Sequence, residues 1–184
     1  MTAAENPTLV CLGSASLRSL RESLERTLGD RAAPLLQEVG YASGPEIYQS
    51  FKSWLHTRAD VADPSELDAS FLGSMVSEFF QEKGWGTVTI EQLGDAVLAI
   101  DTADWAEAGT DTSATTPSCH LTTGLFAAFM TELAGEVMAV MQVECLTCGD
   151  NRCRFLAGSP MALDRVFEAM MEGRPYTEPL ASSP

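Results

Sequence analysis

The chain has 184 residues, 45% of them hydrophobic, so it is long enough to form one domain with a substantial core. A formal net charge of −15 and a pI near 4.3 argue against unaided binding to nucleic acid, whose phosphates would repel the protein. The sequence has no run of about 18 apolar residues, so we expect no membrane span. Residues 1–7 have neither a basic residue nor an apolar stretch, so we expect a cytoplasmic protein without a secretory signal.

Two helices are predicted at the start of the chain. Leucines recur at three- and four-residue steps over Leu17–Leu28, after Ser14, which predicts an amphipathic helix that ends at Gly29. A second helical stretch is expected at about 30–58. We expect it to be interrupted or bent around Gly40–Pro45, because glycine and proline disfavour a helix interior.

A third helix and a hairpin follow. The helix is expected to begin at Asp63, with this residue as N-cap, proline at the first position and Glu66 reaching back, and to end at Gly84. The period then changes to the alternation and β-branched residues of strands at 85–92 and 96–101.

The second half of the chain repeats this mixture of helix and hairpin. We expect a polar, mobile loop, a helix, a strand, a second strand after a cysteine-rich turn, and a final helix, at residues 106–117, 118–133, 137–144, 152–157 and 159–171. The order ααα-ββ-α-ββ-α predicts an α+β single domain with an antiparallel sheet packed on helices. We place this domain at 14–172, between an N-terminal segment, 1–13, and a C-terminal tail, 173–184.

The chemically most specific feature is a cluster of cysteines. Cys145, Cys148 and Cys153 fall within nine residues, and the glycine, aspartate and asparagine between the last two favour a tight turn. Cys-x2-Cys is typical of a zinc knuckle, and tetrahedral zinc needs four donors. Cys119, which begins the helix at 118–133, is the obvious remote fourth. The other candidates for this position are His120, Glu144 and Gln142.

Other interpretations of the cysteines stay open. They can be reduced core residues, a redox pair or the ligands of an iron–sulfur cluster, although the spacing matches no common ferredoxin run. Cys11 has no partner in the sequence and is best explained as a small core residue. The odd number of cysteines makes a disulfide framework a poor explanation.

These residues resemble the 4-vinyl reductase domain family, which includes the sensor domains of phenol- and xylene-responsive activators. The similarity covers about residues 14–172 and is most specific at the C-terminal motif. The motif is a cysteine that begins a glycine-containing helix, a strand, and then Cys-x3-Gly-x3-Cys before an aromatic residue. In this chain it consists of Cys119, Gly124, Cys145, Gly149, Cys153 and Phe155.

The resemblance implies a fold related to nitric-oxide-signalling domains and Golgi-transport tethering subunits, with dimer formation and a buried pocket for an apolar or aromatic ligand. It also implies a structural zinc held by Cys119, Cys145 and Cys153 and by a glutamate three residues before the first hairpin cysteine. Gln142 stands at that glutamate's position. Cys148 or Glu144 is then expected to replace it as the fourth ligand.

A pocket is expected among the third helix, the first two strands and the central helix. The candidate lining residues are large and apolar: Phe71, Met75, Phe79, Trp85, Leu98, Trp105, Leu121 and Phe126, with Ile90 and Phe129 as further members. We find no phosphate-binding loop, nucleophile elbow, dinucleotide fingerprint or HExxH motif, so no catalytic residue is assigned.

The sequence therefore favours a binding domain that senses or carries a small hydrophobic molecule. The family name suggests a tetrapyrrole intermediate as one candidate ligand. Two alternatives remain: an enzyme or accessory factor in (bacterio)chlorophyll vinyl reduction, and an assembly subunit that acts through protein–protein contacts, with a homodimer as the expected form.

Overall fold

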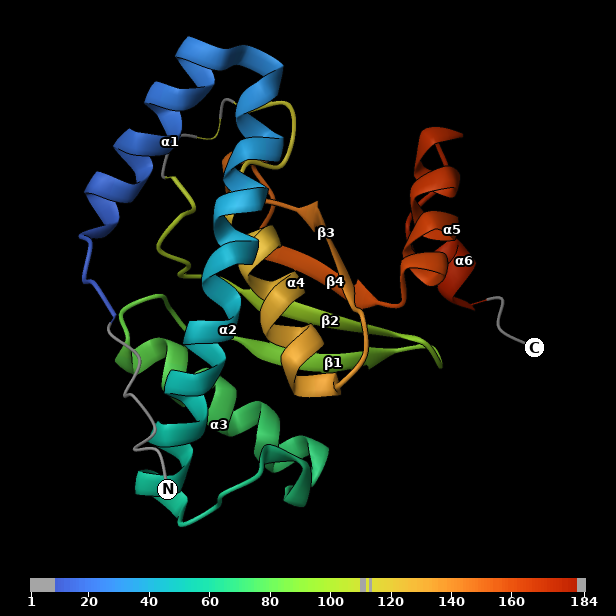
Figure 1. Ribbon diagram of the computed structural model, residues 1–184. Helices are drawn as coiled ribbons and strands as arrows, with labels where there is room; N and C mark the ends of the chain where they lie inside the picture. Colours follow the sequence, from blue (N-terminus) through green and yellow to red (C-terminus); the bar gives the residue numbers. More distant parts are fainter. Residues whose placement is uncertain (1–8, 110–111, 113, 182–184) are drawn as a thin grey trace.

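The computed structural model describes residues 9–109, 112 and 114–181 (Figure 1). Its helices are α1 (Ser14–Leu28), α2 (Ala32–Ala59), α3 (Ala69–Glu82), α4 (His120–Ala134), α5 (Pro160–Met171) and α6 (Glu178–Ala181). Its strands are β1 (Thr89–Leu93), β2 (Val97–Thr102), β3 (Ala139–Glu144) and β4 (Cys153–Gly158). The predicted α+β class and element order are confirmed.

The four strands form one antiparallel sheet in the order β1-β2-β4-β3. Figure 1 shows α2 and α4 on one side of this sheet and α5 with α6 on the other. Successive side chains of a strand point to opposite faces, so Phe155 lies in the large core cluster under α2 and α4, whereas Leu156 packs with α5. We call these the inner and outer faces of the sheet.

Glycines bring α2 and α4 unusually close. A Cβ atom on Gly40 would lie 1.9 Å from the carbonyl oxygen of Leu121, and one on Gly124 would lie 1.9 Å from the carbonyl oxygen of Gln37. The prediction of a break in the second helix was therefore wrong. Although Pro45 lies inside it, α2 runs unbroken over Ala32–Ala59, because its small residues form the tight contact with α4.

Two other boundaries differ from the prediction. Asp63 caps only a short 3₁₀ turn, Pro64–Glu66, and α3 begins later, at Ala69, where the Asp68 carboxylate accepts hydrogen bonds from two backbone N–H groups. The first strand begins at Thr89 rather than at 85, because Gly86 has a φ of +125° that interrupts the extended backbone.

The C-terminal segment is more ordered than a tail. Tyr176 and Leu180 pack against the outer cluster of the sheet and α5. Parts of the loop expected to be mobile, residues 110–111 and 113, lie outside the described residues, as do residues 1–8 and 182–184. Over the described residues, none of the helices combines the length and apolar character needed to cross a membrane.

Candidate metal centre

Three of the four predicted ligands lie together. Cys119 is the N-cap residue of α4, Cys145 directly follows β3, and Cys153 begins β4. Their sulfur atoms form a triangle with sides of 4.0, 3.9 and 3.9 Å, and each residue has an exposed fraction of 0%. With zinc–sulfur bonds of about 2.3 Å, tetrahedral geometry places sulfurs about 3.8 Å apart. The triangle therefore has the dimensions of one face of a metal–thiolate tetrahedron.

The turn between β3 and β4 holds two of these cysteines in place. The Cys145 N–H donates to Asp150 Oδ2 at 2.7 Å, and the Leu146 N–H points at Cys153 Sγ at 3.5 Å. Gly149 has a φ of +88°, a left-handed conformation that suits glycine and lets the chain turn back. The sequence prediction that this turn returns Cys153 to Cys145 agrees with the geometry.

The three thiols do not hold their protons equally. Hydrogen bonds from Cys119 and Cys153, and another from the Thr147 hydroxyl, lower the pKa of Cys145 strongly. The hydrogen bond to Cys145 raises the pKa of Cys119. For Cys153, the hydrogen bond with Cys119 lowers the pKa, but the one with Cys145 and burial outweigh it and raise the pKa to about 12. One thiolate that accepts from two thiols is the starting point for binding a soft cation.

The predicted candidates for a fourth donor are placed differently. Gln142 Oε1 accepts from the Cys119 backbone N–H at 3.0 Å, and its Nε2 donates to the Glu144 carbonyl at 3.2 Å. The Glu144 carboxylate accepts from Arg152 at 2.8 Å and from the Tyr176 hydroxyl, so it is held away from the sulfurs. Gln142 thus caps α4 from the position of the expected glutamate ligand.

Cys148 and His120 remain beside the centre. Cys148 is half-buried and lies outside the group of three sulfurs, but its side chain interacts with Thr147 and Cys145. Burial raises the pKa of Cys148. His120, the first residue of α4, is also half-buried, and burial lowers its pKa.

The predicted pocket residues fall into two groups. Most of them belong to the core under α2 and α4 or pack against it: Met75, Phe79, Trp85, Leu98, Trp105 and Phe126, with Ile90 and Phe129. Phe71, by contrast, is 42% exposed on α3. Leu121 is half-buried and contributes its backbone to the contact with α2.

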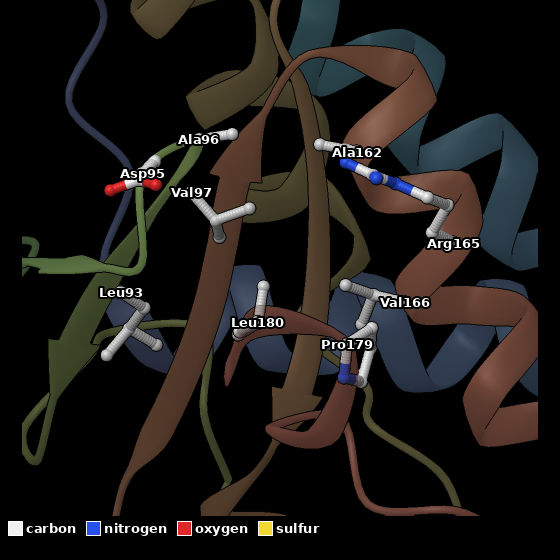
Figure 2. Close-up of a pocket in the computed structure, with 9 residues that line it drawn as sticks. All are labelled: Leu93, Asp95, Ala96, Val97, Ala162, Arg165, Val166, Pro179 and Leu180. Atoms are coloured by element: carbon white, nitrogen blue, oxygen red, sulfur yellow. The ribbon is translucent and has the colours of Figure 1, made fainter. Parts of the chain in front are cut away.

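This core is filled by aromatic rings in contact. Trp105 and Phe126 have ring centroids 5.1 Å apart, and Phe80 lies 5.6 Å from Trp105 and 5.7 Å from Phe126. A cavity does lie elsewhere, between the β1–β2 hairpin, α5 and α6 (Figure 2). Its volume is about 10 Å³, at the lower limit for one water molecule. None of the predicted pocket residues lines it.

Sequence reasoning missed a buried carboxylate. Glu107 is 0% exposed and accepts from the backbone N–H groups of Leu121 (3.0 Å) and Thr122 (2.8 Å) and from the Thr122 hydroxyl. Trp105 Nε1 donates to the same hydroxyl at 2.6 Å. Glu107 therefore satisfies orphan donors at the start of α4. Burial raises the pKa of Glu107, and these hydrogen bonds partly offset the rise. No local pattern marks it within the polar loop.

A second missed feature is a buried polar chain from α1 to the cysteines. Arg21 Nη1 donates to Ser118 Oγ at 2.7 Å, and Ser118 Oγ lies 2.9 Å from Thr147 Oγ1. Thr147 Oγ1 in turn lies 2.9 Å from Cys145 Sγ. The 97 residues between Arg21 and Ser118 leave no sequence signal for this contact.

Comparison with known proteins supports the resemblance. The family model of the 4-vinyl reductase domain matches residues 100–159, which contain β4, α4, β3 and all the clustered cysteines. The resemblance to this family is thereby confirmed over the matched segment. A sequence comparison with curated proteins finds no match.

Solved structures share the fold. The phenol-responsive sensory domain of the transcription activator PoxR, crystallised with phenol, is similar with a TM-score of 0.60 and 21% identity over 82% of this chain and 76% of that chain. Trafficking protein particle complex subunit 3 from Naegleria fowleri, covalently bound to palmitic acid, gives 0.59 and 11% over 79% and 91%. A vinyl-4-reductase family protein from Methanocaldococcus jannaschii gives 0.48 and 17% over 66% of each chain, and no argument rests on it.

Proposed function

We propose that this chain is a small-molecule-binding domain, of sensor or carrier type, for an aromatic or otherwise hydrophobic ligand. The observation that carries the proposal is the match to the 4-vinyl reductase domain over residues 100–159, on a fold shared with a phenol-responsive sensory domain. A tetrapyrrole is the more specific candidate, and it rests on the family name. The cysteine centre would act as a structural zinc site beside the ligand.

The ligand site is proposed at the aromatic core around Trp105. The indole N–H of Trp105, bonded to Thr122, is a polar group within an apolar cluster, and a phenolic hydroxyl can replace such a partner. Because the rings of Trp105 and Phe126 already touch, a ligand must displace side chains. Half-buried Trp85, 5.6 Å from Trp105, marks the side on which the cluster reaches solvent.

Binding of phenol and protoporphyrin IX to the purified full chain tests the ligand proposal. Trp105→Phe removes the indole donor, and we expect it to weaken phenol binding about tenfold, the value of one hydrogen bond. Trp54→Phe, in the contact between α2 and α3, is the matched control and should leave the Kd unchanged. If neither compound binds, and native mass spectrometry finds no co-purified apolar molecule, the ligand proposal is wrong.

For the metal, we propose zinc held by Cys119, Cys145 and Cys153, with Cys148 as the fourth donor. Gln142 and Glu144 are already committed to other hydrogen bonds, whereas Cys148 sits in the same turn and offers a sulfur. When bound, zinc supplies a cross-link between the β3–β4 turn and the start of α4.

Elemental analysis of protein purified without added metal should give about one zinc per chain. Cys153→Ser should lower the Tm sharply, because a lost ligand unties the hairpin from the helix. Cys11→Ser, at an exposed position, is the control. With Co²⁺ in place of zinc, Cys148→Ser should weaken the sulfur-to-metal absorption bands. An unchanged spectrum rejects Cys148 as a ligand, and zinc-free protein rejects the centre itself.

The closed core and exposed apolar side chains favour an assembly subunit as the second candidate. Leu20 on α1 and Leu35 and Val39 on α2 are 48%, 38% and 51% exposed. A homodimer that covers them would explain their exposure. Sedimentation should then show a dimer that Val39→Glu dissociates. A monomeric wild-type chain that binds phenol would reject this candidate in favour of the sensor.

A further inference from the structure

Helix α1 is held to the rest of the protein by few groups. It lies along the edge of the molecule in Figure 1, and its buried residues are Leu17 and Arg21. Arg21 is only 6% exposed, although it is charged. On its own helix it has Glu22 and Glu25 at 4.0 and 3.7 Å, which is too far for strong pairing. Its short contact, 2.7 Å, is with Ser118 at the other end of the polar chain.

The polarity of that chain is fixed by chemistry. A guanidinium only donates, so Ser118 Oγ accepts from Arg21 and keeps its own hydrogen for Thr147 Oγ1 or Cys145 Sγ. If Ser118 donates to Thr147, the Thr147 hydroxyl donates to the sulfur. If Thr147 donates to Ser118, Ser118 points its hydrogen at the sulfur, 3.9 Å away. In both arrangements the chain ends with a hydrogen directed at Cys145.

Burial makes this arrangement consequential. Arg21, Ser118, Thr147 and Cys145 are 6%, 8%, 3% and 0% exposed, so water contributes little to balancing the Arg21 charge. A divalent ion bound by three or four thiolates carries net negative charge. A guanidinium connected to one of those sulfurs through two hydroxyls is therefore placed to offset it.

We propose that Arg21 is a positioning residue of the cysteine centre, and that the metal state of the centre controls the docking of α1 through Ser118 and Thr147. This inference rests on the metal site proposed above. Metal binding would tighten the hydrogen-bonded chain and fix α1, and metal loss would free it. The domain would thus pass the state of a buried centre to a helix at its surface.

The test uses the full chain, stripped of metal under reducing conditions and reloaded with Co²⁺. Hydrogen exchange of the α1 amides should slow about tenfold on loading, the value of one charge-assisted hydrogen bond. The amides of α5, on the outer face of the sheet, provide the internal control and should not respond. The cobalt absorption spectrum reports the sulfur environment in the same samples.

Four variants separate the chain of hydrogen bonds from general packing. Arg21→Met should abolish the metal response of α1 and shift the sulfur-to-cobalt band, and Arg21→Lys should restore part of both. Thr147→Val should uncouple α1 while Arg21 stays in place, and it serves as the test if Arg21→Met does not fold. Arg18→Met is the matched control, because Arg18 donates from the same helix to the Ala106 carbonyl at 3.1 Å and should leave the response intact.

The outcomes distinguish the two proposals. A wild-type chain that binds no cobalt overturns the metal site, and the inference with it. Cobalt binding with unchanged α1 exchange overturns only the inference. So does an α1 response that survives Thr147→Val, or one that Arg18→Met removes as completely as Arg21→Met.

Discussion

The inner and outer faces of the sheet treat polar groups in opposite ways, although the same two strands supply both. Glu144 precedes Cys145 and Arg154 follows Cys153, and the side chains of each pair point to opposite faces. The outer face carries a network in which every member has an opposite charge or hydroxyl to bond: Asp101, Glu144, Arg152, Arg154 and Tyr176.

The difference lies in how far each group is satisfied. On the outer face, Arg154 donates to both oxygens of Asp101 at 2.7 and 2.6 Å, a bidentate pair that needs no further partner. On the inner face, three sulfurs 3.9–4.0 Å apart are weak donors and acceptors for one another. The outer network is thus complete within the protein, whereas the inner cluster has unused capacity for a cation.

The largest predicted effect tests the packing that positions the inner cluster. Gly40→Ala places a Cβ 1.9 Å from the Leu121 carbonyl oxygen and forces α2 away from α4. We expect a loss of about 3–5 kcal/mol in the free energy of unfolding, or no folded protein. Denaturant unfolding measures this.

Gly73→Ala is the matched control for that change. Gly73 also lies inside a helix, α3, but an added Cβ would meet only Ile90 Cβ, at 3.9 Å. This substitution should stabilise the protein by up to about 1 kcal/mol, because alanine favours helix. If both variants change stability equally, close contact between α2 and α4 is not what Gly40 provides.

The second prediction concerns the buried carboxylate at the start of α4. Glu107→Leu leaves the backbone N–H groups of Leu121 and Thr122 without their acceptor. We expect a loss of about 3 kcal/mol in the free energy of unfolding, since each unsatisfied buried donor costs about 1–3 kcal/mol. Chemical denaturation at neutral pH gives the value, and a loss below about 1 kcal/mol would contradict the capping role.

The pH dependence of Glu107 has a definite sign. Burial raises its pKa above the ordinary value of 4.5, although the Thr122 and Leu121 hydrogen bonds and Arg21 oppose the rise. The folded state therefore binds the proton more tightly than the unfolded state. The resulting stability is fully present below pH 4.5 and is lost as pH rises through the folded pKa. Glu107→Gln removes this contribution, so its stability relative to wild type should improve as pH rises over that window.

Local patterns in the sequence predicted the elements but not how they pack. Leucine periodicity, the caps at Gly29 and Gly135, and Ser159 before Pro160 identify the helices and their ends. The unbroken course of α2 could not be predicted, because the helix tolerates Gly40 and Pro45 only in contact with α4. Tertiary packing overrides helix propensity here.

The candidate site divides in the same way. Cys145 and Cys153 were predictable because a short turn connects them, and Cys119 because the family motif includes it. Arg21 and Glu107 were not, since each acts through contacts distant in sequence, and a lone arginine on a helix or a glutamate in a polar loop usually faces solvent.

The third prediction breaks the outer face. Asp101→Asn removes the charge that Arg154 and Arg152 share and leaves Arg154, 8% exposed, poorly compensated. We expect a loss of about 2 kcal/mol in the free energy of unfolding, less than for a fully buried pair. Arg174→Gln, in an exposed ion pair with Glu172, should have no measurable effect. Cobalt affinity should stay unchanged in both variants if the faces are independent.

The smallest effect probes one hydroxyl on the same face. Tyr176→Phe removes the O–H that donates to Glu144 and accepts from Arg154 at 3.2 Å, while the ring keeps its place beside α5. The residue is half-buried, so we expect a loss of about 1 kcal/mol in the free energy of unfolding. Hydrogen exchange should quicken at 174–181 and stay unchanged in α4. Faster exchange in α4, or an altered cobalt spectrum, would show instead that the outer network and the cysteine centre are coupled through the strands they share.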